Sequence, residues 1–245
     1  MKNQIFLLSL AFLFFIFNFE AHAFRFSPMS AALDLTQTDR LLFTLENDSD
    51  SPIAVELTLR GRVPGLTGEE TQPELTDLPV SIFPAQVIIP AKEKRSARVS
   101  WTGKTPPVQE LPLRLIAEQL PINLSKEENG EQGGIKVMMR YVAALYINPG
   151  KTKSDIQVDS FSVSPEGVRA KLINKGSRHQ ILNNASLIFT SSKDKSKKIE
   201  LGVEELKQLQ GENLLPGFAR EFLIPHNERT KKINTDYQLS LILND

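Results

Sequence analysis

The segment from Ile135 to Pro149 constrains the fold more than any other part of this sequence, because its side chains alternate with the period of a β-strand. Every second residue is apolar or aromatic, namely Ile135, Val137, Met139, Tyr141, Ala143, Leu145 and Ile147. This period predicts a single strand with one buried face, longer than the usual roughly 5–6 residues. A polar loop, Ser125 to Gly134, precedes the segment. A long apolar strand that emerges from such a loop is an aggregation hazard unless another segment pairs with it.

The N-terminus has the pattern of a secretory signal peptide. Lys2 precedes an almost wholly apolar run, Ile5 to Phe19, and Ala21-His22-Ala23 supplies the small residues of a cleavage site. The apolar run is shorter than the roughly 20 residues that a membrane-spanning helix needs, so a membrane anchor is the less favoured alternative. We therefore expect residues 1–23 to be removed and the mature chain to begin at Phe24.

Composition limits the classes of function. Cleavage would leave about 220 residues, enough for one large β domain or for two of about 100 residues each. The chain holds 29 basic and 29 acidic residues, and this balance argues against nucleic acid or a strongly anionic membrane as the main partner. The sequence has no cysteine, which excludes a thiol nucleophile and a thiolate metal site.

Short alternating segments separated by turn residues recur along the chain and predict an all-β fold of two immunoglobulin-like sandwiches in tandem. The expected strands before the long segment are Phe24–Asp39 as an edge strand, Arg40–Glu46, Ile53–Arg60, Val80–Phe83, Val87–Ile89, Lys94–Trp101 and Leu111–Leu120. Those after it are Ile156–Val163, Val168–Ile173, Ala185–Thr190, Lys198–Leu201, Phe218–Ile224 and Tyr237–Leu243. Gly61 to Pro79 is expected to be a surface loop, and Val203 to Gln210 is the one helical pattern. The turn at Asn148 to Lys151 predicts a boundary between a domain at 24–149 and one at 150–245.

No motif for catalysis or for cofactor binding is present. Sequence patterns typical of serine hydrolases, zinc proteases and phosphate-binding loops are missing. His179 and His226 stand in turn-like contexts and are interpreted as solvated or capping residues. Glu127, Glu128 and Glu131 crowd one loop without the spacing of a calcium site. We therefore expect no enzyme, no cofactor and no metal, and a secreted hydrolase of unfamiliar type is the weakest alternative.

Three side chains are candidates for contact with a binding partner. Trp101 is expected to be a buried sandwich residue rather than a surface hot spot. Arg140 lies inside the long apolar strand, on its minority face, where a guanidinium must be exposed or hold an anion such as a carboxylate. Arg25 is either a solubilising residue of the mature N-terminus or a second basic group near the first strand.

The order of several motifs resembles that of the periplasmic chaperones of the chaperone–usher pilus pathway. The matching pieces in the first domain are F-S-P-M-S (Phe26–Ser30), P-I-A-V-E (Pro52–Glu56), F-P-A-Q-V-I-I-P (Phe83–Pro90), R-V-S-W-T-G (Arg98–Gly103), L-R-L-I-A-E-Q-L-P (Leu113–Pro121) and G-G-I-K-V-M-M-R-Y-V-A-A-L-Y-I-N-P (Gly133–Pro149). The second domain matches more loosely, through N-K-G-S-R-H (Asn174–His179), G-E-N-L-L-P-G (Gly211–Gly217) and R-E-F (Arg220–Phe222).

The resemblance implies two immunoglobulin-like domains in a boomerang arrangement, in a protein of the periplasm. It also implies donor-strand complementation, in which the last strand of the first domain lends side chains to a pilus subunit that lacks a strand. The lent positions would be Ile135, Val137 and Met139, and Tyr141, Ala143 and Leu145 would continue into the chaperone's own core. An outer-membrane usher would then receive the subunit, and the free chaperone could self-associate.

One departure from the family concerns the anchor for the subunit's terminal carboxylate. The resemblance implies an Arg on the first strand and a Lys on the last strand, but the equivalent positions here are Ser30 (or Met29) and Ala144. This pattern resembles a divergent, alternative branch of the family, with Arg140 and Arg25 as the candidate anchors. An immunoglobulin-like structural or adhesive surface protein, which self-assembles through the same strand, remains the alternative function.

Overall fold

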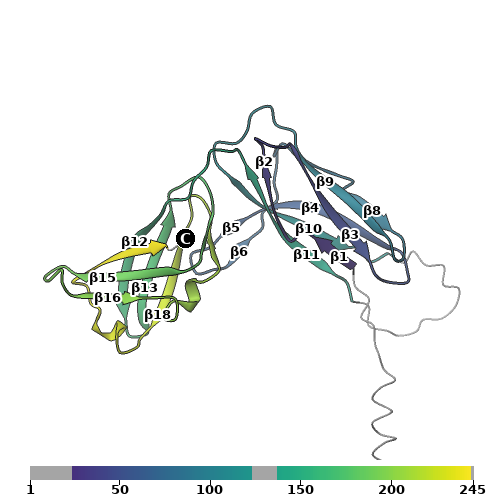
Figure 1. The fold of residues 1–245 in the computed structure, drawn as a ribbon. Coiled ribbons are helices and arrows are strands. Elements are labelled where there is room, and N and C mark those ends of the chain that lie inside the picture. Colours follow the sequence, from purple (N-terminus) through teal and green to yellow (C-terminus); the bar gives the residue numbers. More distant parts are fainter. Residues whose placement is uncertain (1–23, 123–136, 244–245) are drawn as a thin grey trace, which may run out of the picture.

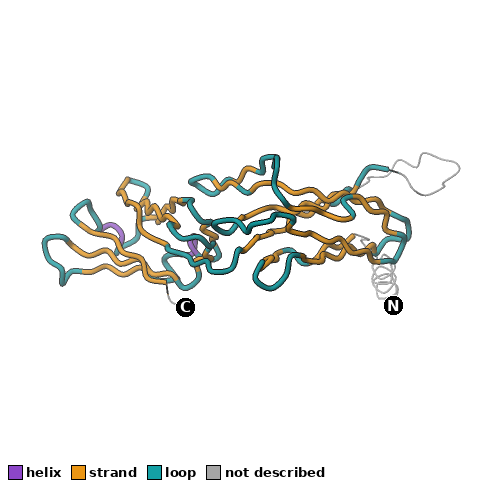
Figure 2. The backbone as a smooth tube through the Cα atoms, turned by 90° about the horizontal axis from the view of Figure 1, so that it is seen from above, coloured by secondary structure: helices purple, strands orange, loops and turns teal. Residues whose placement is uncertain are grey.

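The computed structural model describes residues 24–122 and 137–243, and in these ranges the chain folds into two arms that meet at an angle (Figure 1). Strands make up most of both arms, and the two helical segments described are single 3₁₀ turns, η1 Lys207–Leu209 and η2 Thr230–Lys232 (Figure 2). The predicted all-β fold of two sandwiches in a boomerang arrangement is confirmed. We use the predicted boundary at Pro149 to name the arms domain 1 and domain 2.

Domain 1 is a sandwich of two sheets. One sheet has the order β1-β3-β9-β7, formed by β1 (Phe24–Ser27), β3 (Arg40–Asn47), β9 (Lys94–Trp101) and β7 (Val80–Phe83). The other has the order β2-β11-β10-β4-β8, formed by β2 (Ser30–Asp34), β11 (Arg140–Asn148), β10 (Leu111–Gln119), β4 (Ile53–Gly61) and β8 (Gln86–Ile89). The first expected strand is therefore two strands in different sheets, because the chain crosses the sandwich between Ser27 and Ser30.

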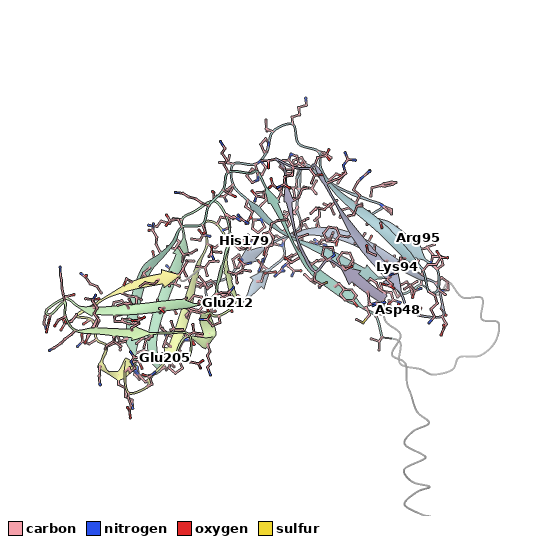
Figure 3. All side chains as sticks on the ribbon, viewed as in Figure 1. Asp48, Lys94, Arg95, His179, Glu205 and Glu212 are labelled. Atoms are coloured by element: carbon pink, nitrogen blue, oxygen red, sulfur yellow. The ribbon has the colours of Figure 1, made fainter. Side chains whose placement is uncertain are left out.

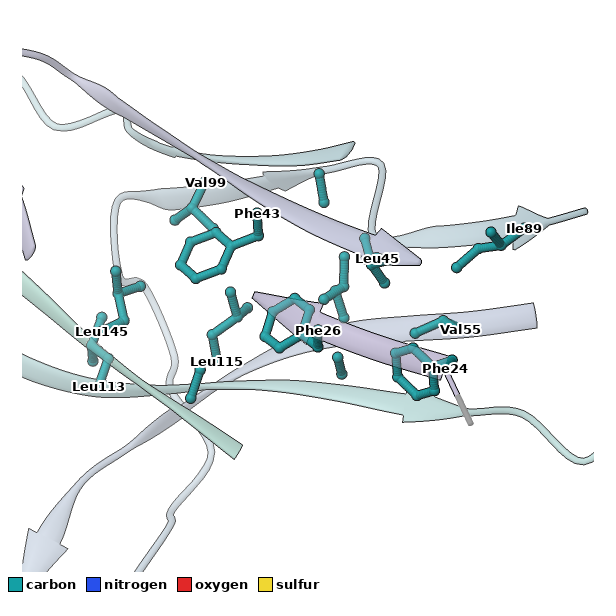
Figure 4. Close-up of a cluster of buried hydrophobic side chains, with 14 of the residues drawn as sticks. Phe24, Phe26, Phe43, Leu45, Val55, Ile89, Val99, Leu113, Leu115 and Leu145 are labelled. Atoms are coloured by element: carbon teal, nitrogen blue, oxygen red, sulfur yellow. The ribbon is translucent and has the colours of Figure 1, made fainter. Parts of the chain in front are cut away.

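The core of domain 1 lies between these sheets and is made by the alternating residues of each strand (Figure 4). Phe43, Leu45, Leu115 and Leu145 are fully buried there. Burying side chains of this size stabilises the fold by about 1.5–3 kcal/mol each before the entropy cost of ordering. Trp101 packs partly buried against the same core, which agrees with its expected role in the sandwich.

A buried asparagine fixes the turns at one end of each domain. In domain 1, the Asn47 amide donates to the carbonyl oxygens of Ser51 (2.8 Å), Ile89 (3.1 Å) and Pro90 (3.1 Å). In domain 2, the Asn174 amide donates to the carbonyl oxygens of Arg178 (2.7 Å) and Leu214 (3.0 Å). Both side chains are fully buried, so each satisfies carbonyl groups that would otherwise lie without a partner in the interior.

Domain 2 has a separate core and smaller sheets. Its sheet orders are β12-β13-β18, β16-β15-β19 and the pair β14-β17. The strands are β12 (Ile156–Ser164), β13 (Gly167–Asn174), β14 (Gln180–Leu182), β15 (Ala185–Ser191), β16 (Lys198–Leu201), β17 (Glu212–Leu214), β18 (Ala219–Pro225) and β19 (Tyr237–Leu243). Leu172, Leu187 and Phe189 are fully buried between them.

Several local expectations need correction. The strand expected from Ile135 begins at Arg140, and residues 137–139 are outside any strand, because the partner β10 ends at Gln119. The expected loop Gly61 to Pro79 contains a short hairpin, β5 (Val63–Pro64) and β6 (Glu70–Thr71). The helical pattern at Val203 to Gln210 forms only the single turn η1.

Other expectations fall outside the two ranges. Residues 1–23, the loop glutamates Glu127, Glu128 and Glu131, and Ile135 are not described. Within residues 24–122 and 137–243, no helix has the length and apolar character needed to cross a membrane. The same residues include no group of three or more His, Cys, Asp or Glu side chains that could hold a metal ion.

Candidate functional site

The candidate site is an open edge on β11. On one side, β11 pairs with β10 along most of its length, from Arg140 opposite Glu118 to Ile147 opposite Leu111. On the other side it pairs with β2, but only from Ala144 onward. The first residues of β11 therefore pair on one side only within the described chain. Their free N–H and C=O groups form a template on which another strand can pair.

The edge exists because β1 and β2 divide between the two sheets. β2 runs parallel to the second half of β11, with Ala144 opposite Ser30 and Asn148 opposite Asp34. β1, which precedes it, pairs instead with β3 in the opposite sheet. The sandwich thus stays open between β1 and the first half of β11.

Two of the three predicted donor residues, Val137 and Met139, directly precede this edge. The Val137 side chain is 70% exposed, and Met138 beside it is 36% exposed. Met139 is partly buried against the core of domain 1, and its carbonyl oxygen accepts a hydrogen bond from Gln119 N at 3.0 Å. Ile135, the third predicted donor residue, lies outside the described residues.

Tyr141 ties the open edge to β1. Its hydroxyl donates a hydrogen bond to the carbonyl oxygen of Phe24. The Tyr141 ring also meets the Phe24 ring edge-on, with centroids 4.9 Å apart and planes at 84°. Phe26 continues the cluster and stacks on Phe43 at 5.5 Å. One aromatic side chain therefore joins the two sheets at the place where backbone pairing is missing.

The two candidate anchors lie on the surface and form ion pairs. Arg140 Nε is 3.4 Å from Glu118 Oε2, its neighbour across the strand pair, and the Arg140 side chain is 47% exposed. Arg25 contacts Glu46 at 3.0 Å and Asp48 at 2.8 Å, and its hydrogen bond to Asp48 raises the pKa of the guanidinium. Asp48 lies at the end of domain 1 that is distant from domain 2 (Figure 3).

The positions that the resemblance relates to the carboxylate anchor are neighbours in the structure. Ala144 is opposite Ser30 on β2, and Ala144 N donates to the carbonyl oxygen of Met29 at 2.9 Å. On the other side of Ala144, the cross-strand neighbour is Arg114 of β10. The sheet therefore has an arginine on β10, at the position next to Ala144 of β11.

Arg114 belongs to a partly buried ionic network. Arg114 Nε and Nη2 donate to the two carboxylate oxygens of Glu70 at 2.7 and 2.6 Å, and Arg62 Nε donates to Glu70 Oε2 at 2.8 Å. Partial burial raises the pKa of Glu70, but the hydrogen bonds from Arg114 and Arg62 more than offset this effect and lower the pKa to about 2. Glu70 thus remains ionised between the two arginines. This network was not predicted from the sequence, although Arg114 interrupts an apolar strand just as Arg140 does.

A hollow of about 360 Å³ adjoins the network at the junction of the domains. Its lining residues are Arg62, Pro64, Gly68, Glu69, Glu70 and Arg114 of domain 1, and Gly211, Glu212, Asn213 and Arg220 of domain 2. Arg220 Nη2 forms an ion pair with Glu212 Oε2 at 2.8 Å. The hairpin β5–β6 also reaches domain 2, because Glu221 N donates to the carbonyl oxygen of Leu66 at 2.8 Å.

The far end of β11 is held by domain 2. The Tyr146 ring stacks on His179 with centroids 4.0 Å apart, and the Tyr146 hydroxyl accepts hydrogen bonds from Arg62 and Asn213, both at 2.8 Å. Figure 3 shows His179 where the two arms meet. His179 Nδ1 lies 2.6 Å from Oε1 of Glu110, a carboxylate that is 1% exposed. Of the two roles expected for His179, solvated or capping, the solvated one is wrong, since the side chain is 17% exposed and forms part of the contact between the domains. His226 lies elsewhere and contacts the carbonyl oxygen of Ser164 at 2.8 Å.

Known structures share this architecture at low sequence identity. No protein-family model and no curated protein matches the sequence. CfaA, the chaperone of class 5 fimbriae, has a TM-score of 0.58 at 15% identity, over 89% of this chain and 98% of that chain. A chain of a chaperone–tip adhesin complex of CFA/I fimbriae biogenesis has a TM-score of 0.57 at 17% identity, over 83% and 90% of the two chains.

A third structure comes from the archaic chaperone–usher Csu pili of Acinetobacter baumannii. A chain of its CsuC–CsuE complex, a chaperone with a tip adhesion subunit, has a TM-score of 0.55 at 16% identity, over 84% of this chain and 88% of that chain. These likenesses extend over both domains rather than over one sandwich. The protein therefore has the two-domain β-sandwich fold of the fimbrial chaperones.

Proposed function

We propose that the protein is a periplasmic chaperone that caps fimbrial subunits by donor-strand complementation and delivers them to an outer-membrane usher. The observation that carries this proposal is the first half of β11, which pairs with β10 but has no described partner on its other side. The fold supports the same function, because the structures that resemble this chain include complexes of chaperones with tip subunits.

The open edge suits a partner that lacks a strand. An incomplete sandwich exposes a hydrophobic groove and unpaired backbone groups, and both favour polymerisation. A strand added from the chaperone would satisfy those backbone groups, while side chains at every second position would fill the groove. The Val137 side chain is in solvent, so its burial in the groove of a subunit would stabilise the complex, by about 1.5–3 kcal/mol for a side chain of this kind.

The donor residues of this proposal are Ile135, Val137 and Met139. Met139 is already partly packed against the core of domain 1, so it would mark the transition from the lent segment to the strand that belongs to the chaperone. Tyr141 and Ala143 follow on the same face and hold the edge to the sandwich. Transfer of the subunit needs no nucleotide, since a better-fitting strand from the next subunit can displace the donor strand.

The subunit's terminal carboxylate needs a cationic anchor on this chain. Arg140 and Arg25 remain candidates for it, and we propose Arg114 as a third. Arg114 is the cross-strand neighbour of Ala144, on the face of the sheet that turns toward the hollow between the domains. A bidentate guanidinium–carboxylate pair, such as Arg114 already forms with Glu70, is the geometry that such an anchor requires.

The test is capture of a fimbrial subunit coded beside this chain, co-expressed with either the parent or the Val137→Asp variant. We expect the variant to fold and to recover at least tenfold less subunit, because a buried carboxylate would replace a buried isopropyl group. Val108→Asp, at a fully exposed loop position, is the matched control and should recover as much subunit as the parent. Equal recovery by the Val137→Asp variant would refute the proposed role of this edge.

The same open edge also fits the alternative, an adhesive or structural protein that self-assembles. This alternative predicts stable homopolymers of the purified chain without any subunit, which sedimentation velocity would detect. A folded monomer that captures subunits instead supports the chaperone.

A further inference from the structure

The end of domain 2 opposite the domain junction carries two basic segments (Figure 1). The first is the turn between β15 and β16 with the start of β16, which holds Lys193, Lys195, Lys197 and Lys198 beside Asp194. Lys193 is paired with Asp236 at 2.6 Å. The second is the turn at η2, with Arg229, Lys231 and Lys232. A chain that is neutral as a whole therefore concentrates positive charge at this end.

A hollow of about 390 Å³ opens between the two segments. It is lined by Ser196, Lys197, Lys198, Ile199, Arg229, Lys232 and Tyr237. Four of these seven side chains are cationic and none is acidic. The hollow at the domain junction differs in this respect, because glutamates stand beside its arginines.

The cations of this hollow are poorly neutralised. Arg229 Nη1 contacts Glu205 at 2.8 Å, and Lys197 lies 3.9 Å from Asp194. Lys198 and Lys232 form no ion pair with any residue in the described ranges. Two positive charges thus remain uncompensated even when both acids are counted, and their mutual repulsion would be relieved by a bound anion.

We propose that this hollow binds a phosphate group. A phosphomonoester carries nearly two negative charges at neutral pH, which matches the uncompensated charge. Lysine is a common ligand of phosphate, and the Tyr237 hydroxyl, which has no hydrogen-bond partner among the described residues, can donate to one of its oxygens. The Ile199 side chain and the Tyr237 ring supply an apolar wall for the group that carries the phosphate.

This site is separate from the open edge of β11, since the two lie in different arms of the molecule (Figure 1). A phosphate could therefore bind while a subunit occupies domain 1. The phosphate could belong to a free solute or to an anionic lipid headgroup, and in the second case the site would hold the end of domain 2 at a membrane surface. The two sources differ in whether a bilayer is needed for binding.

The experiment measures binding by the mature chain and by two double variants. Lys198→Gln with Lys232→Gln removes the unpaired cations of the hollow. Lys104→Gln with Lys175→Gln is the matched control, because these lysines are exposed, have no ion pair among the described residues and lie outside the hollow. Isothermal titration with inorganic phosphate tests the free solute, and flotation with vesicles that contain phosphatidic acid, against phosphatidylcholine vesicles, tests a lipid headgroup with a phosphomonoester. Thermal melting checks that each variant is folded.

We expect the parent to bind at least one of these probes and the hollow variant to bind it at least tenfold more weakly, given that a charge-assisted hydrogen bond contributes about a factor of ten or more. Binding to inorganic phosphate supports a free solute as the source, and binding to anionic vesicles alone supports a lipid. Failure of the parent to bind either probe, or an equal loss in the control variant, would overturn the proposal.

Discussion

The Tyr141 hydroxyl of β11 donates a hydrogen bond to the carbonyl oxygen of Phe24 in β1, so that one side chain joins the two sheets of domain 1 at their open side. No strand pairing connects β1 and β11, which belong to different sheets. The aromatic rings of Tyr141, Phe24 and Phe26 cover the core beneath this gap. The open edge is therefore joined to β1 at Tyr141, while the Val137 side chain is exposed four residues before it.

We predict that Tyr141→Phe destabilises domain 1 by about 0.5–1.5 kcal/mol, the usual net contribution of one hydrogen bond. The ring contact with Phe24 is kept, so the core should remain intact. Urea unfolding followed by the fluorescence of Trp101, the only tryptophan of the chain, reports on domain 1 directly. Tyr237→Phe, which removes a hydroxyl without a described hydrogen-bond partner, should leave the same transition unchanged. A Tyr141→Phe transition identical to that of the parent would show that the hydrogen bond to Phe24 contributes nothing.

We predict that Asn47→Ala lowers the stability of domain 1 by about 2–4 kcal/mol, because buried carbonyl groups lose their donor. Asn174→Ala should do the same to domain 2 and leave the Trp101 signal nearly unchanged, since Trp101 packs against the core of domain 1. Far-ultraviolet circular dichroism follows both domains and should show a second transition in the Asn174 variant. A shift of the Trp101 transition in both variants would mean that the domains unfold as one unit.

Most strands were predictable because burial on one face imposes a period of two. Val80–Phe83 and Lys94–Trp101 begin and end where the alternation does, and β10 follows its apolar pattern despite the arginine within it. The two-residue strands β5 and β6 and the three-residue strands β14 and β17 were missed, since segments so short carry no measurable period. The predicted start of β11 was wrong for another reason. Alternation continues through Val137, but a strand needs a partner, and β10 has ended.

The alternating pattern of the proposed donor segment is visible in the sequence, whereas the ionic contacts could not be predicted from it. Arg62 and Glu70 flank the hairpin β5–β6, but Arg114 is 44 residues from Glu70 in the sequence. The three meet because β10 pairs with β4, which leads into this hairpin. His179 and Glu110 likewise meet across the two domains. Sequence periodicity locates the faces of strands, but it gives no information about which distant charges the fold brings together.

We predict that Arg114→Ala weakens subunit capture more than Arg140→Ala or Arg25→Ala. Arg114 lies beside Ala144 near the domain junction, whereas the other two are exposed and form surface ion pairs, which contribute little. The measurement is the affinity of each variant for a subunit with a free C-terminus and for the same subunit with an amidated C-terminus. An anchor residue is one whose loss removes the difference between the two subunits. If Arg140→Ala alone removes it, the carboxylate binds at the start of β11 instead.

The ionic network around Glu70 predicts a dependence of stability on pH. The pKa of Glu70 is about 2 in the folded chain, below its value of 4.5 in an unfolded peptide. A carboxyl group with a lowered pKa stabilises the fold above its unfolded pKa, and this contribution is lost as the pH falls from about 4.5 toward 2. We therefore expect Glu70→Gln to lower the free energy of unfolding at pH 7, by on the order of 1–2 kcal/mol after solvent screening.

The difference between the parent and Glu70→Gln should shrink between pH 4.5 and pH 2, because Glu70 of the parent then becomes neutral as well. Urea unfolding at pH 7, 4.5 and 3, followed by Trp101 fluorescence, measures this trend. Glu74→Gln is the matched control, since Glu74 pairs with Arg60 at 2.6 Å but is largely exposed, and it should change the stability little at any pH. The free energies of unfolding of the parent and of Glu70→Gln could instead differ by the same amount down to pH 3. The amide would then destabilise the fold through its shape or hydrogen bonding, and the missing charge would not be the cause.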